Sequence, residues 1–181
     1  MLTLSKLFYK GAVYSEVVEV PDWLYHITFL RNIESIQTAG LQAGGTANWQ
    51  TYDVAGKLFF TSAGGIRTWL HKLSYIARDK SDTEVEDGLV PVVLRVPRKL
   101  LDDLEQDIEG SRDGSADAFF THKSVKPESI EIFDGTVWTD VENVDEYTLR
   151  DYAVENSEHE TDGDEEYILL DEDMFLPPNL L

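Results

Sequence analysis

The stretch WLYHITF, residues 23–29, decides the fold expected for this chain, because it separates polar from apolar side chains on one strand. Its aromatic and β-branched residues are typical of a strand, in which residues two apart point to the same face. Positions 25, 27 and 29 then form a wholly apolar face, and His26 and Thr28 share the other. That second face either lines a pocket, where His26 bonds a ligand and Thr28 orients it, or leaves a half-exposed histidine near a strand end.

Further elements extend on both sides of this strand. The segment 32–41, NIESIQTAGL, predicts a short helix with Asn32 as its N-cap and Gly40 as its stop. Residues 65–80 repeat apolar side chains at helical spacing, and 98–107 predict a short helix or turn. The remaining runs predict strands at 12–20, 58–62, 89–97, 118–125 and 129–135. This order indicates an α+β domain whose later strands form a mixed or antiparallel sheet.

The charged residues are distributed unevenly along the chain. The net charge is −20, and the stretch from Asp140 to Asp173 holds fifteen acidic residues and one basic residue. We therefore expect one domain over residues 1–138 and an acidic, partly ordered or disordered C-terminal segment over 139–181. Such a surface repels nucleic-acid phosphates, so duplex binding is excluded unless the segment itself imitates a nucleic acid.

Cysteine is absent, which excludes disulfides and thiolate metal sites and fits a reducing compartment. No stretch reaches the roughly 20 apolar residues of a membrane span, and the first residues lack the pattern of a signal peptide. We therefore expect a cytoplasmic protein with no membrane partner. The four histidines show no paired spacing of the H-x-x-x-H kind, so no metal site is expected.

Two further places carry candidate site residues. Thr61 and Ser62 close the predicted strand LFFTS, and Trp69 follows on the next helix. Hydroxyls beside an aromatic ring can hold a flat polar ligand, although the same residues also suit a helix N-cap and a core tryptophan. Asp117 opens a predicted strand after a glycine- and serine-rich loop. Its carboxylate either stabilises a cationic, oxocarbenium-like centre or is a solvated turn residue.

In order, the motifs YHIT…SI…GL, LFFTS…W, PVVLRV and VKPESIEI resemble the ADP-ribosyltransferase fold, and they are closest to its small bacterial and phage members with a His-x-Thr strand. The resemblance covers roughly residues 23–134. It implies two small, split sheets of mixed or antiparallel strands flanked by short helices, with NAD in the cleft between them.

The same resemblance assigns roles to the candidate residues. His26 would contact the nicotinamide-side ribose, with Thr28 beside it. Phe60 would stack on nicotinamide, where tyrosine is usual, and Trp69 or His71 would help to enclose the ring. Asp117 would take the place of the late-strand acid that bonds the ribose and stabilises the cation. Aspartate is one methylene shorter than the glutamate that is common there.

Two kinds of function follow. One is a NAD-dependent mono-ADP-ribosyltransferase, a toxin or phage-encoded host modifier, which transfers ADP-ribose to a protein or nucleic-acid acceptor. The other is a catalytically inactive acidic binding or inhibitor protein, which imitates nucleic acid and engages a basic partner. A third version joins them: the C-terminal stretch YILLDEDMFLPPNLL folds back over the cleft and regulates activity.

Overall fold

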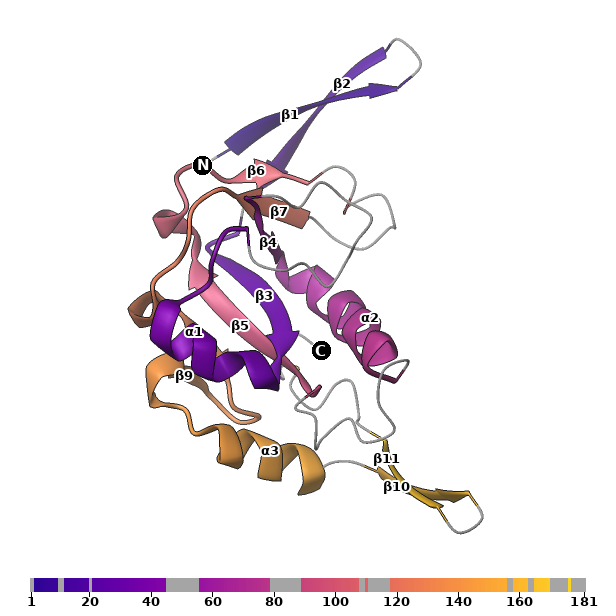
Figure 1. Cartoon of the computed structure of the whole chain (residues 1–181). Coiled ribbons are helices and arrows are strands. Elements are labelled where there is room, and N and C mark those ends of the chain that lie inside the picture. The colour runs from indigo at the N-terminus through magenta and orange to yellow at the C-terminus, as the bar shows by residue number, and fades with distance from the viewer. Residues whose placement is uncertain are drawn as a thin grey trace.

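A seven-stranded sheet forms the centre of the molecule, and every neighbouring pair of its strands is antiparallel. The structure is a computed structural model. It describes residues 2–9, 12–19, 21–44, 56–78, 89–107, 110, 118–155, 158–162, 165–169 and 176. The strand order is β6-β7-β4-β3-β5-β8-β9 (Figure 1). The strands are β3 (Trp23–Phe29), β4 (Leu58–Thr61), β5 (Pro91–Pro97), β6 (Glu105–Gln106), β7 (Ala118–Thr121), β8 (Glu131–Phe133) and β9 (Trp138–Asp140).

Three α-helices accompany this sheet among the described residues, which confirms the α+β class. They are α1 (Ile33–Ala39), α2 (Ile66–Arg78) and α3 (Glu146–Glu155). Short 3₁₀ turns join the elements: η1 (Leu30–Asn32), η2 (Ala63–Gly65), η3 (Arg98–Leu100), η4 (Pro127–Ser129) and η5 (Val141–Asn143). Two hairpins stand apart from the sheet: β1 (Leu2–Tyr9) with β2 (Ala12–Glu19), and β10 (Glu158–Asp162) with β11 (Glu165–Leu169).

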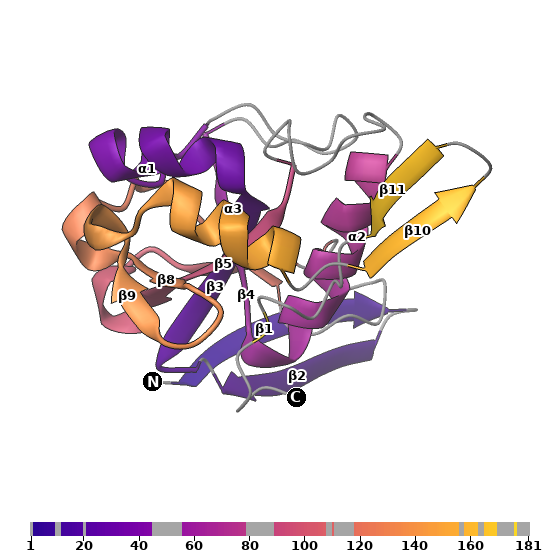
Figure 2. The ribbon, with the colours of Figure 1, turned by 90° about the horizontal axis from the view of Figure 1, so that it is seen from below.

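The sheet is covered on both faces. One face carries Leu24 of β3, and it packs in one apolar cluster with Ile33 of α1 and Leu149 of α3. The opposite face carries Tyr25, which packs with Ile66 and other residues of α2. Figure 2 shows α1 beside α3. The alternation of WLYHITF therefore divides the core into two layers, and both of them are apolar.

Strands β3 and β4 meet over a very short length. Their register has a single residue pair, Tyr25 with Thr61, whereas β3 pairs with β5 along all seven of its residues, from Trp23 to Phe29. The expected separation into two sheets is therefore not complete, because this one pair joins the strands into one sheet. Beyond Tyr25 the backbones of β3 and β4 are no longer paired.

The folded unit continues past the expected boundary at residue 138. That position is the first residue of β9, which pairs with β8. Val141, Leu149 and Ala153 are fully buried in the same cluster as Leu24. The acidic composition did not indicate this packing, because α3 buries Leu149 and Ala153 while Asp151 and Glu155 are exposed.

Gly40 ends α1 at a position that only glycine fits. Its φ is +75°, in the left-handed region, and its backbone N–H donates to the carbonyl of Ile36 at 2.7 Å. A Cβ placed there would lie 2.0 Å from the carbonyl oxygen of Val125. The predicted helix stop at Gly40 is therefore confirmed, and the close approach lets Leu41 form a bridge with Val125.

Candidate functional site

His26 lies where β3 and β4 cease to pair. Its Nδ1 atom is 2.8 Å from the backbone carbonyl oxygen of Phe59. A carbonyl oxygen only accepts hydrogen bonds, so Nδ1 carries the proton of this bond. The imidazole thus donates to a carbonyl of β4 that would accept a hydrogen bond from a backbone N–H of the neighbouring strand in a continuous ladder. This side-chain hydrogen bond connects the two strands at a point where no backbone–backbone hydrogen bond does so.

Burial sets the charge of His26. Removal from water lowers the pKa of the imidazole, and the bond to the carbonyl of Phe59 raises it only in part. The ring is therefore neutral at neutral pH. In the neutral ring with a proton on Nδ1, Nε2 holds a lone pair and acts as an acceptor. This arrangement can receive a hydrogen bond from a hydroxyl group, such as those of a ribose.

Thr28 shares the face of His26 but is already engaged. Its side chain is buried, and its Oγ1 accepts a hydrogen bond from Nδ2 of Asn32 at 2.9 Å. This bond joins the end of β3 to η1. Asn32 occupies the predicted N-cap position of α1, but its side chain bonds Thr28 and makes no cap bond to the helix. The buried Thr28 hydroxyl therefore helps to fix the end of the strand that carries His26.

Phe60 packs inside the core. Its side chain is 3% exposed and belongs to the apolar cluster of Leu24. Its ring meets the His26 ring in an edge-on arrangement, with 6.1 Å between centroids. A buried ring can hold the imidazole in place, but it offers no open face for stacking on nicotinamide. Thr61 is also buried, and Ser62 precedes η2 without a side-chain cap bond.

The neighbouring Phe59 is more accessible and was missed from the sequence. Its side chain is partly exposed and lies on the sheet face opposite to Phe60. Two consecutive phenylalanines in LFFTS cannot share a face of a strand, so one of them had to leave the core. The sequence contained this signal, but it did not say which phenylalanine was buried.

Trp69 lies on a different face of the sheet from His26. Trp69 belongs to α2, which packs on the Tyr25 face of β3, and the Lys72 ammonium lies 4.6 Å from its ring centroid. Trp69 and the His26 ring therefore lie on opposite sides of β3. Asp117 lies outside the described residues. Its neighbour Ala118 pairs with Thr61, which in turn pairs with Tyr25 next to His26.

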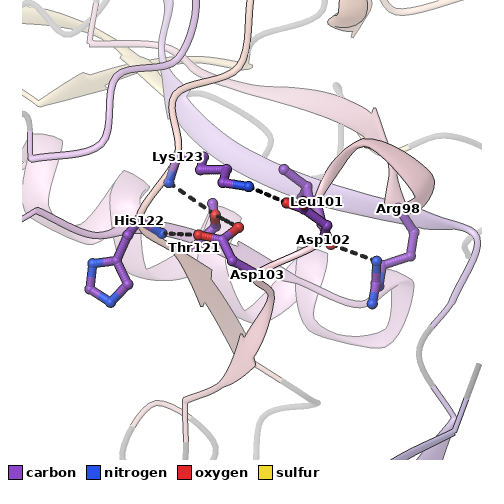
Figure 3. Close-up of polar contacts among 7 residues, drawn as sticks. All are labelled: Arg98, Leu101, Asp102, Asp103, Thr121, His122 and Lys123. Carbon is purple, nitrogen blue, oxygen red and sulfur yellow. Dashed lines mark hydrogen bonds and ion pairs between the residues drawn. The ribbon is translucent and has the colours of Figure 1, made fainter.

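A polar cluster fixes the far end of β7 (Figure 3). Asp103 accepts hydrogen bonds from the Thr121 hydroxyl and, at 3.2 Å, from the backbone N–H of His122. Burial opposes ionisation of Asp103, but these bonds outweigh it, and the pKa of the carboxyl is lowered. Nearby, Lys123 forms an exposed ion pair with Asp102. This cluster holds the chain as it leaves the sheet.

Comparison with family models, curated proteins and solved structures finds no match to this chain. None of the helices in the described ranges is long and apolar enough to cross a membrane. The described residues also contain no group of three histidine, aspartate or glutamate side chains able to hold a metal ion. The site is therefore interpreted from its own geometry.

Proposed function

We propose that the chain binds NAD at the join between β3 and β4 and transfers ADP-ribose to an acceptor. One observation carries the proposal: a neutral His26, fixed through Nδ1 to the carbonyl of Phe59, holds Nε2 as an acceptor where the two strands separate. An imidazole in this state suits a ribose hydroxyl donor. The antiparallel sheet and the α+β class also agree with the proposal, but they are less specific evidence than the position of His26.

The proposed chemistry is dissociative. The glycosidic bond between the ribose C1′ and the nicotinamide nitrogen breaks, and nicotinamide leaves with the bonding electron pair. The ribosyl cation that remains is attacked by a nucleophile of the acceptor, which then loses a proton. His26 orients the ribose through its hydroxyl, and a carboxylate nearby stabilises the positive charge. Asp117 is the proposed carboxylate because the sequence places it directly before β7.

Release of nicotinamide from NAD tests the proposal. The wild-type chain should release nicotinamide, and both His26→Ala and Asp117→Ala should reduce the rate by about 100-fold or more, as expected for groups that position or stabilise the reacting centre. Glu34→Ala is the control, because Glu34 is exposed on α1. Absence of NAD turnover in the wild type, in the presence of protein and RNA acceptors, would contradict the proposal.

A second candidate function is supported by the surface of η5 and α3. Glu142, Asp145, Asp151 and Glu155 are exposed there, together with Tyr147 at 74%. This acidic surface suits a basic protein partner. An oligolysine peptide is a suitable probe, and D151N combined with E155Q should weaken its binding more than E34Q on α1 does. Equal binding by both variants would exclude this function for α3.

A further inference from the structure

A group of four side chains, here called the aromatic patch, lies on the sheet face opposite to Phe60. It consists of Lys57, Phe59, Phe120 and His122. The centroids of Phe59 and Phe120 are 6.1 Å apart, and those of Phe120 and His122 are 5.5 Å apart. Lys57 extends over Phe120, with its ammonium 4.7 Å from the ring centroid. The four groups therefore form one continuous surface.

The strand register explains why these rings lie together. Phe59 of β4 is directly opposite Phe120 of β7, and the next pair, Phe60 with Phe119, faces the core. Phe59, Phe120 and Lys57 are partly exposed, and His122 is exposed. The planes of Phe59 and Phe120 are inclined by 52° to each other, so the two rings offer an angled apolar surface that keeps contact with water and against which an aromatic ligand can pack.

His122 is held in a defined orientation at one end of the patch. Its Nδ1 donates to the carbonyl oxygen of Gly56 at 2.9 Å, and its backbone N–H bonds Asp103. Gly56 has a φ of +71°, which places that carbonyl beside the imidazole. Figure 3 shows the imidazole pointing away from the Asp103 carboxylate. The ring nitrogen Nε2 of His122 therefore remains for a polar group of a ligand.

We propose that the aromatic patch binds a single nucleotide, with its base on Phe59 and Phe120 and its phosphate at Lys57. Stacking on aromatic side chains suits any nucleobase, and the Lys57 ammonium, which lies over the Phe120 ring, suits a phosphate. The net charge of −20 opposes a long phosphate backbone, so the ligand is one nucleotide and not a strand.

This inference rests on the proposed function for its natural ligand, the adenosine phosphate half of NAD. The backbone carbonyl of Phe59 holds His26, whereas the side chain of Phe59 lies on the opposite face of the sheet, so the ligand would extend from His26 past the strand join to the patch. The nicotinamide-side ribose would then be at the strand join and the adenine base on the outer face. Glu105 is exposed and pairs with Phe120 across β6 and β7. Its negative charge repels a phosphate, so the phosphate would bind at the Lys57 end of the patch.

Adenosine monophosphate tests the inference, because it has no nicotinamide bond to break. We expect the wild-type chain to bind it in a calorimetric or NMR titration. Phe120→Leu and Lys57→Gln should each weaken binding about tenfold, through loss of stacking and of the phosphate contact respectively. Glu105→Gln should strengthen it, since a like charge is removed. Ribose 5-phosphate, which has no base, should bind more weakly than adenosine monophosphate.

Matched controls are available elsewhere on the surface. Tyr147→Leu removes an exposed ring from α3, and Lys126→Gln removes an ammonium that is 81% exposed. Both should bind adenosine monophosphate like the wild type, and thermal unfolding should show every variant folded. Failure of the wild type to bind, or unchanged binding by folded Phe120→Leu and Lys57→Gln, would overturn the inference. Nucleotide binding without nicotinamide release would contradict the proposed function and leave the patch assignment standing.

Discussion

At the scale of single residues, the geometry of His26 determines what the candidate site can do. One ring nitrogen is used by the protein, in the bond to Phe59, and the other is an acceptor as long as the ring is neutral. Burial keeps it neutral by lowering the pKa. The residue therefore combines a structural contact with a possible ligand contact, and the two depend on the same protonation state.

We predict that His26 titrates below the usual range for histidine. The signals of its imidazole in a pH-dependent ¹H–¹⁵N NMR spectrum should show a proton on Nδ1 at neutral pH. Because the folded-state pKa is lowered, the unfolded chain binds the proton more readily than the folded chain does. The free energy of unfolding therefore decreases as the pH falls from about 6.5 towards the folded-state pKa. His26→Gln should remove that part of the pH dependence. A normal or raised pKa would contradict this account of the ring.

The two consecutive phenylalanines of β4 should respond differently to truncation. Phe60→Ala should lower the free energy of unfolding by about 3–5 kcal/mol, because it leaves a cavity in the core. Phe59→Ala removes a partly exposed ring and should cost about 1 kcal/mol. Denaturant unfolding of both variants measures the difference. Equal losses would mean that the assignment of the two faces of β4 is wrong.

At the scale of the elements, the sequence predicted what depends on short-range pattern. Alternation identified β3, helical spacing identified α2, and Gly40 marked the end of α1. The pattern could not determine which strands become neighbours. The single pair between β3 and β4 is a property of the tertiary structure, and so is the use of His26 in place of a backbone donor. The family resemblance implied that Phe60 stacks on nicotinamide, whereas its side chain lies in the core.

Gly40→Ala should strongly destabilise the chain. The added Cβ would meet the carbonyl of Val125, and the left-handed φ is unfavourable for alanine. We expect a loss of about 2 kcal/mol or more in the free energy of unfolding. Gly64→Ala is the control, because Gly64 is exposed and is not among the glycines with positive φ. If both variants unfold at the same denaturant concentration, the close packing of Gly40 on Val125 does not contribute to stability.

At the scale of the whole molecule, described residues of the acidic segment 139–181 belong to the folded core. Leu149 and Ala153 of α3 complete the core, and Leu176 is buried with Tyr25 and Leu70 on the face covered by α2. Leu176 therefore contacts the sheet on the side opposite to His26. The net charge of this segment did not predict the packing, because its few buried leucines stand among many acidic residues.

Leu176→Ala should lower the free energy of unfolding by about 2 kcal/mol or more, since it removes a buried side chain from the layer between β3 and α2. Leu100→Ala is the matched control, because that leucine is 45% exposed and should cost about 0.5 kcal/mol or less. Thermal or denaturant unfolding compares them. A Leu176 variant as stable as wild type would show that the C-terminal residues contribute nothing to the core.

The most direct test of the central claim is an NAD titration of the wild-type chain, followed through the imidazole ¹⁵N signals of His26. The account predicts that the Nε2 signal moves with saturation as it accepts a hydrogen bond from the ribose, while Nδ1 keeps its proton and its bond to Phe59. His26→Ala should bind NAD at least about tenfold more weakly, the loss expected for one such hydrogen bond. NAD binding that leaves the His26 signals unchanged, or no NAD binding, would contradict the account.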